Sequence, residues 1–175
     1  MLRILVILCS FLTFSELYAQ AWVQETYDEL IESQGNSRRE YPRLKITDSK
    51  EFIARFSSRT NTIFLEKEVI SFIEKELANR KEDAIAYILA HELGHYKYDH
   101  GWLRRTGERF ASRQAIRKLY EIGISRDRYL ADEAEADAYA GLITVLSGFE
   151  SIDIADDLLR GLYREYGIPE DVEGY

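Results

Sequence analysis

The feature that most constrains the fold of this chain is the helical spacing of its apolar residues, which runs from Lys67 almost to the C-terminus. Side chains that recur every three to four positions lie on one face of a helix and are buried together. Gly123 and Gly148 interrupt the pattern, and glycine commonly follows the end of a helix. The pattern predicts helices at Glu68–Asn79, Glu82–Tyr98, Leu103–Ile122, Asp132–Leu146 and Ile152–Tyr166.

The segment before Lys67 has a different pattern. Trp22–Glu32 is predicted to be a helix, and three short runs of extended character follow a polar break. These predicted strands are Leu44–Thr47, Phe52–Phe56 and Thr62–Leu65. We expect them to form a small antiparallel sheet of about three strands packed on the helical body, which makes the fold class α+β, mostly α.

The first 21 residues have the layout of a secretory signal. Arg3 precedes an apolar run from Ile4 to Phe14, which is too short to stay across a membrane, and small residues follow at Ala19 and Ala21. Cleavage is predicted after residue 19 or 21. We therefore expect a signal peptide at 1–19, a single domain at 22–175, and an exported protein that is periplasmic or secreted. An uncleaved signal that anchors the chain is the alternative.

Cysteine and charge narrow the class of protein further. The single cysteine, Cys9, lies inside the predicted signal, so the mature chain has no disulfide and must be stabilised by a packed core. Acidic residues outnumber basic ones by 31 to 23, for a net charge of −8. Since phosphate binding needs a basic surface, nucleic acid is excluded as the general partner. One local basic stripe at helical spacing is either a solvated face or a contact for a membrane surface or an acidic partner. The stripe consists of Arg105, Arg109, Arg113 and Arg117.

One motif carries specific chemistry, and it reads His91-Glu92-Leu93-Gly94-His95 inside a predicted helix. Side chains four positions apart lie about 40° apart around a helix, so the two imidazoles can bind one metal ion. Glu92 lies beside this pair, where it can accept a proton from water. Gly94 has no side chain, which lets another element approach closely. The alternative is a chance match on a solvated helix.

A third ligand would distinguish these interpretations, and two regions offer one. Asp99 and His100 are near in the sequence. On a continuing helix, however, His100 points away from the histidine pair, so we interpret it as a residue at the helix end or behind a ligand. Residues 132–140 offer Glu133 and Asp137 on one helix face, with alanines beside them.

Small residues allow this later helix to pack closely on the first. Glu133 is then predicted to be the third ligand, and Asp137 to hold a ligating imidazole by its other nitrogen. Two histidines and one glutamate leave a fourth position open, which is typical of a catalytic zinc site with one ion per chain. Taken alone, the acidic patch is better explained as a solvated helix face.

At these positions the chain resembles one family of zinc metallopeptidases. Its members, which include the heat-shock protease HtpX and the CAAX prenyl protease, are gluzincins with the motifs HExxH and ExxAD. These motifs read here as His91-Glu92-Leu93-Gly94-His95, followed by His100, and Glu133-x-x-Ala136-Asp137. The resemblance covers residues 44–166 and implies a helical zincin core. It also implies that His91, His95 and Glu133 bind Zn²⁺, that Glu92 is the general base and that Asp137 supports a ligand.

The resemblance further implies an endopeptidase whose protein or peptide substrate adds as a strand to the edge of the sheet. The chain departs from the family at Ile53-Ala54-Arg55-Phe56, where the family often has an Asn-Ala-Phe-like stretch. It also lacks the membrane helices of the membrane-bound members, so we expect a minimal soluble version. All histidines lie within 91–100, so support for an oxyanion would fall to Arg128 or Tyr139. The related ImmA/IrrE-like regulators share the HELGHY pattern but are intracellular.

We therefore expect an exported zinc-dependent endopeptidase that hydrolyses peptide bonds in unfolded or extended protein segments. The main alternative is a zinc-stabilised, non-cleaving chaperone or envelope-assembly factor that binds extended chains at the sheet edge. Glu92 argues against it, because a purely structural metal site has no need of a base. A third alternative is an export-linked binding domain that holds no metal.

Overall fold

The computed structural model describes residues 21–35, 39–50, 52–100 and 126–165, with side chains from residue 131 onward in the last range. The predicted signal at 1–19, the predicted helix Leu103–Ile122 and its basic stripe lie outside the described residues. Among the described helices, none has both the length and the hydropathy that crossing a membrane requires.

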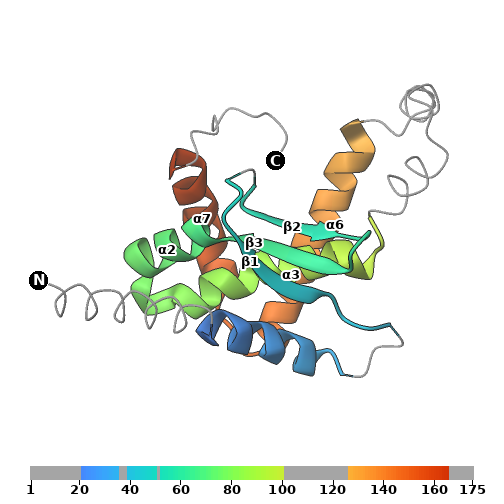
Figure 1. Ribbon diagram of the computed structural model, residues 1–175, viewed down its shortest axis with the longest axis horizontal. Coiled ribbons are helices and arrows are strands. Elements are labelled where there is room, and N and C mark those ends of the chain that lie inside the picture. The colour runs from blue at the N-terminus through green and yellow to red at the C-terminus, as the bar shows by residue number, and fades with distance from the viewer. Residues whose placement is uncertain (1–20, 36–38, 51, 101–125, 166–175) are drawn as a thin grey trace, which may run out of the picture.

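Helices dominate the described structure, and one small sheet stands among them (Figure 1). A helix at 21–33 precedes the three strands, and the other helices follow them. The strands are β1 (Arg43–Thr47), β2 (Ala54–Ser57) and β3 (Thr62–Glu66). The later elements are α2 (Lys67–Glu76), the 3-10 helix η1 (Ala78–Arg80), α3 (Lys81–Lys97), α6 (Arg126–Leu146) and α7 (Ile152–Glu165). The predicted class, α+β and mostly α, is confirmed.

The sheet is mixed, which corrects the prediction that it is antiparallel. Its strand order is β1-β3-β2; β2 pairs antiparallel with β3, but β1 pairs parallel with β3. The reason lies in the connection from β1 to β2, which starts beside Glu66 and ends beside Leu65. It crosses the end of β3, a distance of about 10 Å that a few extended residues span easily. Within this connection, Ser49 donates backbone and side-chain hydrogen bonds to the buried Glu66 carboxylate.

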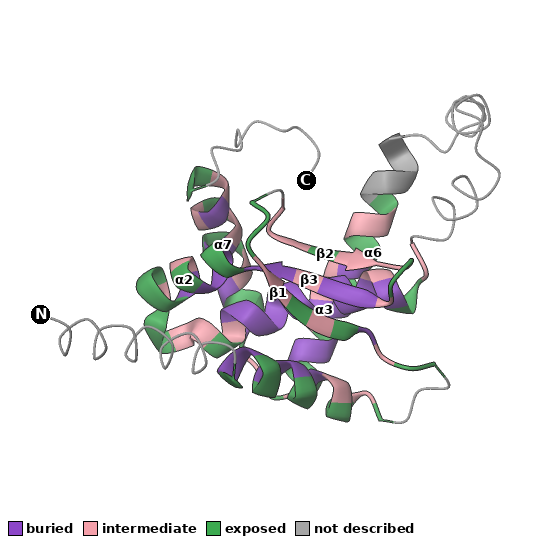
Figure 2. Ribbon diagram, in the orientation of Figure 1, coloured by how far each residue is buried: buried purple, intermediate pink, exposed green. Residues whose placement is uncertain are grey.

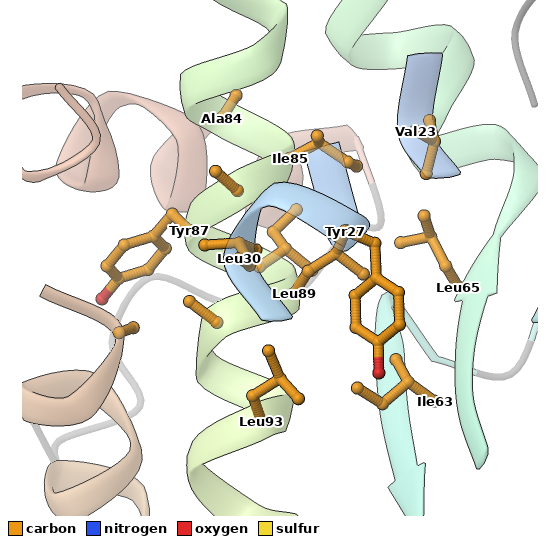
Figure 3. Packing of buried hydrophobic residues seen from close by; sticks show 14 of the residues in the cluster. Val23, Tyr27, Leu30, Ile63, Leu65, Ala84, Ile85, Tyr87, Leu89 and Leu93 are labelled. Atoms are coloured by element: carbon orange, nitrogen blue, oxygen red, sulfur yellow. The ribbon is translucent and has the colours of Figure 1, made fainter. Parts of the chain in front are cut away.

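Helix α3 forms the centre of the molecule. Ile85, Leu89, Leu93 and Tyr96, which share one side of the helix at spacings of three and four residues, are buried. Burial also extends around the rest of the helix, because α2, α6, α7 and the sheet all contact it (Figure 2). In Figure 3 the side chains of α3 meet those of β3 and of the helix at 21–33. A helix packed in this way around most of its surface holds its buried side chains in fixed positions.

The helix at 21–33 is part of this core. Trp22 and Val23 are buried, and the Trp22 indole donates a hydrogen bond to Glu74 in α2. The hydroxyl of the buried Tyr27 donates to the Pro42 carbonyl at 2.6 Å, just before β1. These contacts attach the helix both to α2 and to the start of the sheet.

Candidate metal centre

The two helices that carry the predicted ligands, α3 and α6, pack at very close range. A Cβ atom on Gly94 would lie only 2.8 Å from the Ala136 Cα and 3.1 Å from the Ala136 carbonyl oxygen. The absence of a side chain at Gly94 therefore permits this approach, as the sequence suggested. Glu133 and Asp137 lie three residues before and one residue after Ala136, so the same contact carries both carboxylates toward the histidines of α3.

The ligating atoms of three side chains form a compact triangle. The Nε2 atoms of His91 and His95 are 3.1 Å apart. Glu133 Oε2 lies 3.3 Å from His91 Nε2, and Glu133 Oε1 lies 3.6 Å from His95 Nε2. Zinc bonds of 2.0–2.1 Å in a tetrahedron separate neighbouring ligand atoms by about 3.3 Å. Each of the three separations is close to this length, with the two histidines facing different oxygens of the Glu133 carboxylate, and one donor atom from each side chain lies within 4.8 Å of the other two.

The chemistry of these donors also fits a divalent metal. Two imidazoles and one carboxylate are donors that zinc accepts, and three protein donors leave one tetrahedral position for another group. The side chains of His91, His95 and Glu133 are 16–18% exposed, so the triangle is mostly buried but remains in contact with solvent. His91, His95 and Glu133 could therefore hold one metal ion.

The outer nitrogen of His91 is held by α6. His91 Nδ1 is 2.7 Å from Asp137 Oδ1, and the Tyr87 hydroxyl donates to the same oxygen at 3.1 Å. A carboxylate behind a ligating imidazole fixes its tautomer and ring orientation. The sequence suggested this place for Asp137. Sequence reasoning missed Tyr87. The signal for it was its position four residues, about one helical turn, before His91.

His100 contacts the outer nitrogen of His95. The two Nδ1 atoms are 2.8 Å apart, and His100 Nε2 is 3.1 Å from Glu135 Oε2. This arrangement depends on the end of α3, where Asp99 has a φ of 54° and the His100 amide donates to the His95 carbonyl. Such a left-handed turn reverses the chain, so His100 lies beside His95. His100, Asp132 and Glu135 also have donor atoms within 4.8 Å of one another.

Glu92 is buried beside the triangle and reaches the sheet. Its Oε2 accepts a hydrogen bond of 2.5 Å from the Phe56 amide in β2. Burial raises the pKa of Glu92 to about 7, although the charge of His91 and the Phe56 hydrogen bond act in the opposite direction. A carboxyl group with a pKa near neutrality both accepts and returns a proton readily.

The ligand triangle holds a proton when no metal is bound. Burial lowers the pKa of His91, but its hydrogen bonds with Asp137 and Glu133 outweigh burial and raise that pKa to about 10. Burial and the neighbouring His91 charge lower the pKa of His95 to about 4. Burial opposes ionisation of Glu133, yet the two histidines hold the pKa of its carboxyl below the usual value. A divalent cation would replace the His91 proton and neutralise the same carboxylates.

A model of peptidase family M48 matches residues 18–112, more than half of the chain. The chain belongs to peptidase family M48. This confirms the resemblance to the metallopeptidases that include HtpX and the CAAX prenyl protease. No curated protein and no solved structure matches the chain. The match contains His91, Glu92 and His95 but ends before α6, so the position of Glu133 rests on the geometry described above.

The predicted oxyanion partners are not brought to the triangle by the described contacts. The Tyr139 hydroxyl donates to the Gln34 side chain, and its ring contacts Tyr98. Arg128 belongs to α6, but its side chain lies outside the described residues. Sequence reasoning did not single out Tyr163 of α7. Burial raises the pKa of its hydroxyl, and the negative charges of Asp137 and Glu133 raise it further.

Proposed function

We propose that this chain is an exported, zinc-dependent endopeptidase that cleaves unfolded or extended protein segments. Membership of peptidase family M48 supports a metallopeptidase with a protein substrate. The observation that carries the proposal is the triangle of His91, His95 and Glu133, whose donor atoms approach one another at 3.1–3.6 Å, close to the spacing of ligands around a tetrahedral zinc ion, with a buried glutamate beside them. A zinc ion bound there supplies a Lewis acid that polarises the scissile carbonyl and lowers the pKa of water.

The residues of the chain then have separate roles. His91, His95 and Glu133 hold the ion, and Asp137 and Tyr87 fix the ring of His91. Glu92 is the general base: with Oε2 fixed by the Phe56 amide, its carboxylate takes a proton from the attacking water and returns it to the leaving amine.

An extended substrate fits the arrangement of the sheet. In the described sheet β2 lies at one edge, and its Phe56 amide touches the proposed base directly. A peptide that pairs with this edge would bring its backbone to Glu92 without requiring a particular side-chain sequence. Arg55, the residue before Phe56 in β2, is exposed, and its guanidinium stacks on the ring of Phe52.

We also propose that residues 1–19 act as a signal peptide and that residues 22–175 form one metallopeptidase domain. Trp22 and Val23 are buried in the core, so cleavage after Ala19 would keep both of these core residues in the mature chain. N-terminal sequencing of the protein recovered from the cell envelope or culture medium tests this. A mature protein that still begins at Met1 would favour the anchored alternative.

The function is tested with the purified mature chain, its Glu92→Gln variant and Glu82→Gln as a matched control. Glu82 is exposed on the same helix, far from the histidines in sequence. We expect about one zinc per chain in all three proteins. We also expect casein cleavage to be about 10²- to 10⁴-fold slower in Glu92→Gln, because a general base contributes that much, and unchanged in Glu82→Gln.

Each other outcome has a defined meaning. Full activity in Glu92→Gln would refute the role of the base. Zinc-loaded wild-type protein that leaves unfolded casein intact would favour the non-cleaving chaperone or envelope-assembly factor. A purified protein that binds no zinc would favour the metal-free binding domain.

A further inference from the structure

Helix α6 is connected to both histidines of the triangle by hydrogen bonds, but by different routes. The outer nitrogen of His91 meets Asp137 directly. The outer nitrogen of His95 meets His100, and the far nitrogen of His100 meets Glu135, which lies two residues before Asp137. The second route therefore runs from Glu135 through His100 to His95.

Proton placement along this route follows from the donors. A neutral His95 that binds a metal through Nε2 carries its one proton on Nδ1. A single proton fits between two nitrogens 2.8 Å apart, so His100 Nδ1 must be the acceptor. A neutral His100 then carries its own proton on Nε2, which lies 3.1 Å from Glu135 Oε2 and 3.9 Å from Asp132 Oδ1. Every group along the route has a matching partner.

The burial of the groups supports an indirect action of Glu135. The His100 side chain is only 6% exposed, and its backbone is held by the left-handed turn at Asp99. Its ring therefore has little freedom except rotation of the imidazole, which exchanges the two nitrogens. Glu135 is 59% exposed and touches only the outer nitrogen of that ring. Its carboxylate selects the ring orientation in which His100 accepts from His95.

We propose that Glu135 is a positioning residue for the metal centre, acting through His100 to fix the ring of His95. The inference rests on the proposed function, since it assumes that His95 binds a metal through Nε2. It adds a second carboxylate to the one behind His91, so that α6 supplies one ligand and orients the other two.

The same three groups allow a competing interpretation as a second cation site, because donor atoms of His100, Asp132 and Glu135 lie within 4.8 Å of one another. A cation on His100 Nε2 would displace the proton that faces Glu135. His100 would then have to donate from Nδ1, leaving His95 without a proton for that contact. The two uses exclude each other, and zinc stoichiometry separates them.

The test is a double-mutant cycle on zinc affinity, measured by competition with a chromophoric chelator. The variants are His100→Ala, Glu135→Ala and the double variant, with Asp156→Ala as a control that removes an exposed acid on α7. We expect His100→Ala to raise the zinc Kd by about 10- to 100-fold. Glu135→Ala should raise it by about 3- to 10-fold, as the loss of one hydrogen bond does. The double variant should equal His100→Ala, because Glu135 has no route without His100.

Further readouts separate positioning from folding. Glu135→Gln keeps an acceptor oxygen for His100 and should retain most of the affinity, whereas a purely electrostatic role would make it as weak as Glu135→Ala. Thermal unfolding in chelator should be nearly equal for wild type, Glu135→Ala and Glu135→Gln.

Three results would overturn the inference. The first is a zinc Kd in the double variant that is raised by the product of the two single-variant factors. The others are an unchanged zinc Kd in Glu135→Ala and a second bound zinc ion that Glu135→Ala removes. If the wild-type chain binds no zinc, the proposed function fails as well. If the wild type binds zinc and cleaves casein while the losses multiply, only the role of Glu135 fails.

Discussion

The contact between Gly94 and Ala136 allows a quantitative test of how the candidate metal centre is assembled. In Gly94→Ala, the new methyl would lie 2.8 Å from Ala136 Cα, 3.1 Å from its carbonyl oxygen and 3.2 Å from its Cβ. Carbon atoms in contact prefer separations of about 3.5–4.0 Å. Two of the three atoms belong to the backbone and have no rotamer to change, so α3 and α6 must move apart by about 0.7–1.2 Å, the difference between 2.8 Å and that separation.

The expected cost combines two opposing terms. Overpacking a tight contact costs about 1–3 kcal/mol, whereas replacing a helical glycine by alanine gains about 1 kcal/mol from helix propensity. Gly141→Ala is a matched control inside α6, because the nearest atoms to its new methyl are those of Ile152 at an ordinary 3.9 Å. Gly141→Ala should show only the gain from helix propensity, without the overpacking cost. The two variants should therefore differ by about 1–3 kcal/mol in the free energy of unfolding.

Thermal unfolding in the presence of chelator measures this difference. At about 2–4 °C per kcal/mol for a chain of this size, Gly94→Ala should melt about 2–12 °C below Gly141→Ala. Zinc affinity should fall by about tenfold or more in Gly94→Ala alone, because moving α6 shifts Glu133 by more than a metal bond tolerates. A Gly94→Ala protein that is as stable as Gly141→Ala and binds zinc equally well would refute the close-packing argument.

Two further predictions concern the helix at 21–33. Trp22→Ala should lower the free energy of unfolding by about 3–5 kcal/mol in urea titrations, because the indole is buried and donates to Glu74; an unchanged midpoint would show that this helix is not part of the stable core. Tyr27→Phe should cost about 1–3 kcal/mol at pH 7, because the Pro42 carbonyl loses its hydrogen bond. Burial raises the pKa of Tyr27 above its ordinary 10. The contribution of Tyr27 to the free energy of unfolding should therefore be constant below pH 10 and decrease above it. Urea unfolding at pH 8 and pH 10.5 should show a smaller fall in Tyr27→Phe, and equal falls would contradict a buried, protonated phenol.

Sequence reasoning could bring the candidate ligands together because their geometry is local to two helices. The four-residue spacing of His91 and His95 places both rings on one face of any helix, and α3 has that form. Glu133 could be predicted because small residues surround it, and Ala136 does make the close contact with Gly94. The spacing of residues along a helix and the size of each side chain can both be determined from the sequence alone.

The features that sequence reasoning missed depend on how the chain changes direction. The parallel pairing of β1 and β3 follows from a short connection that passes over the end of β3, which the strand pattern does not encode. His100 does lie behind His95, as the sequence suggested, but the route differs: the angular argument assumed that α3 continues, whereas Asp99 adopts a left-handed conformation after the helix has ended. Asparagine and aspartate tolerate that conformation better than most residues, yet nothing in the sequence requires it here.

The Phe56 amide shows why the sheet matters to the chemistry as well as to the fold. A buried carboxylate needs a hydrogen bond to remain ionised at reasonable cost, and Glu92 receives one from a backbone group of β2. Any residue type except proline supplies such a donor, so the contact leaves no mark on the sequence. β2 is thus held on one side by its pairing with β3 and on the other by the proposed base. The same strand therefore holds the carboxylate of Glu92, which α3 carries, and presents the edge on which the proposed substrate would pair, so that β2 would contact both the base and the substrate.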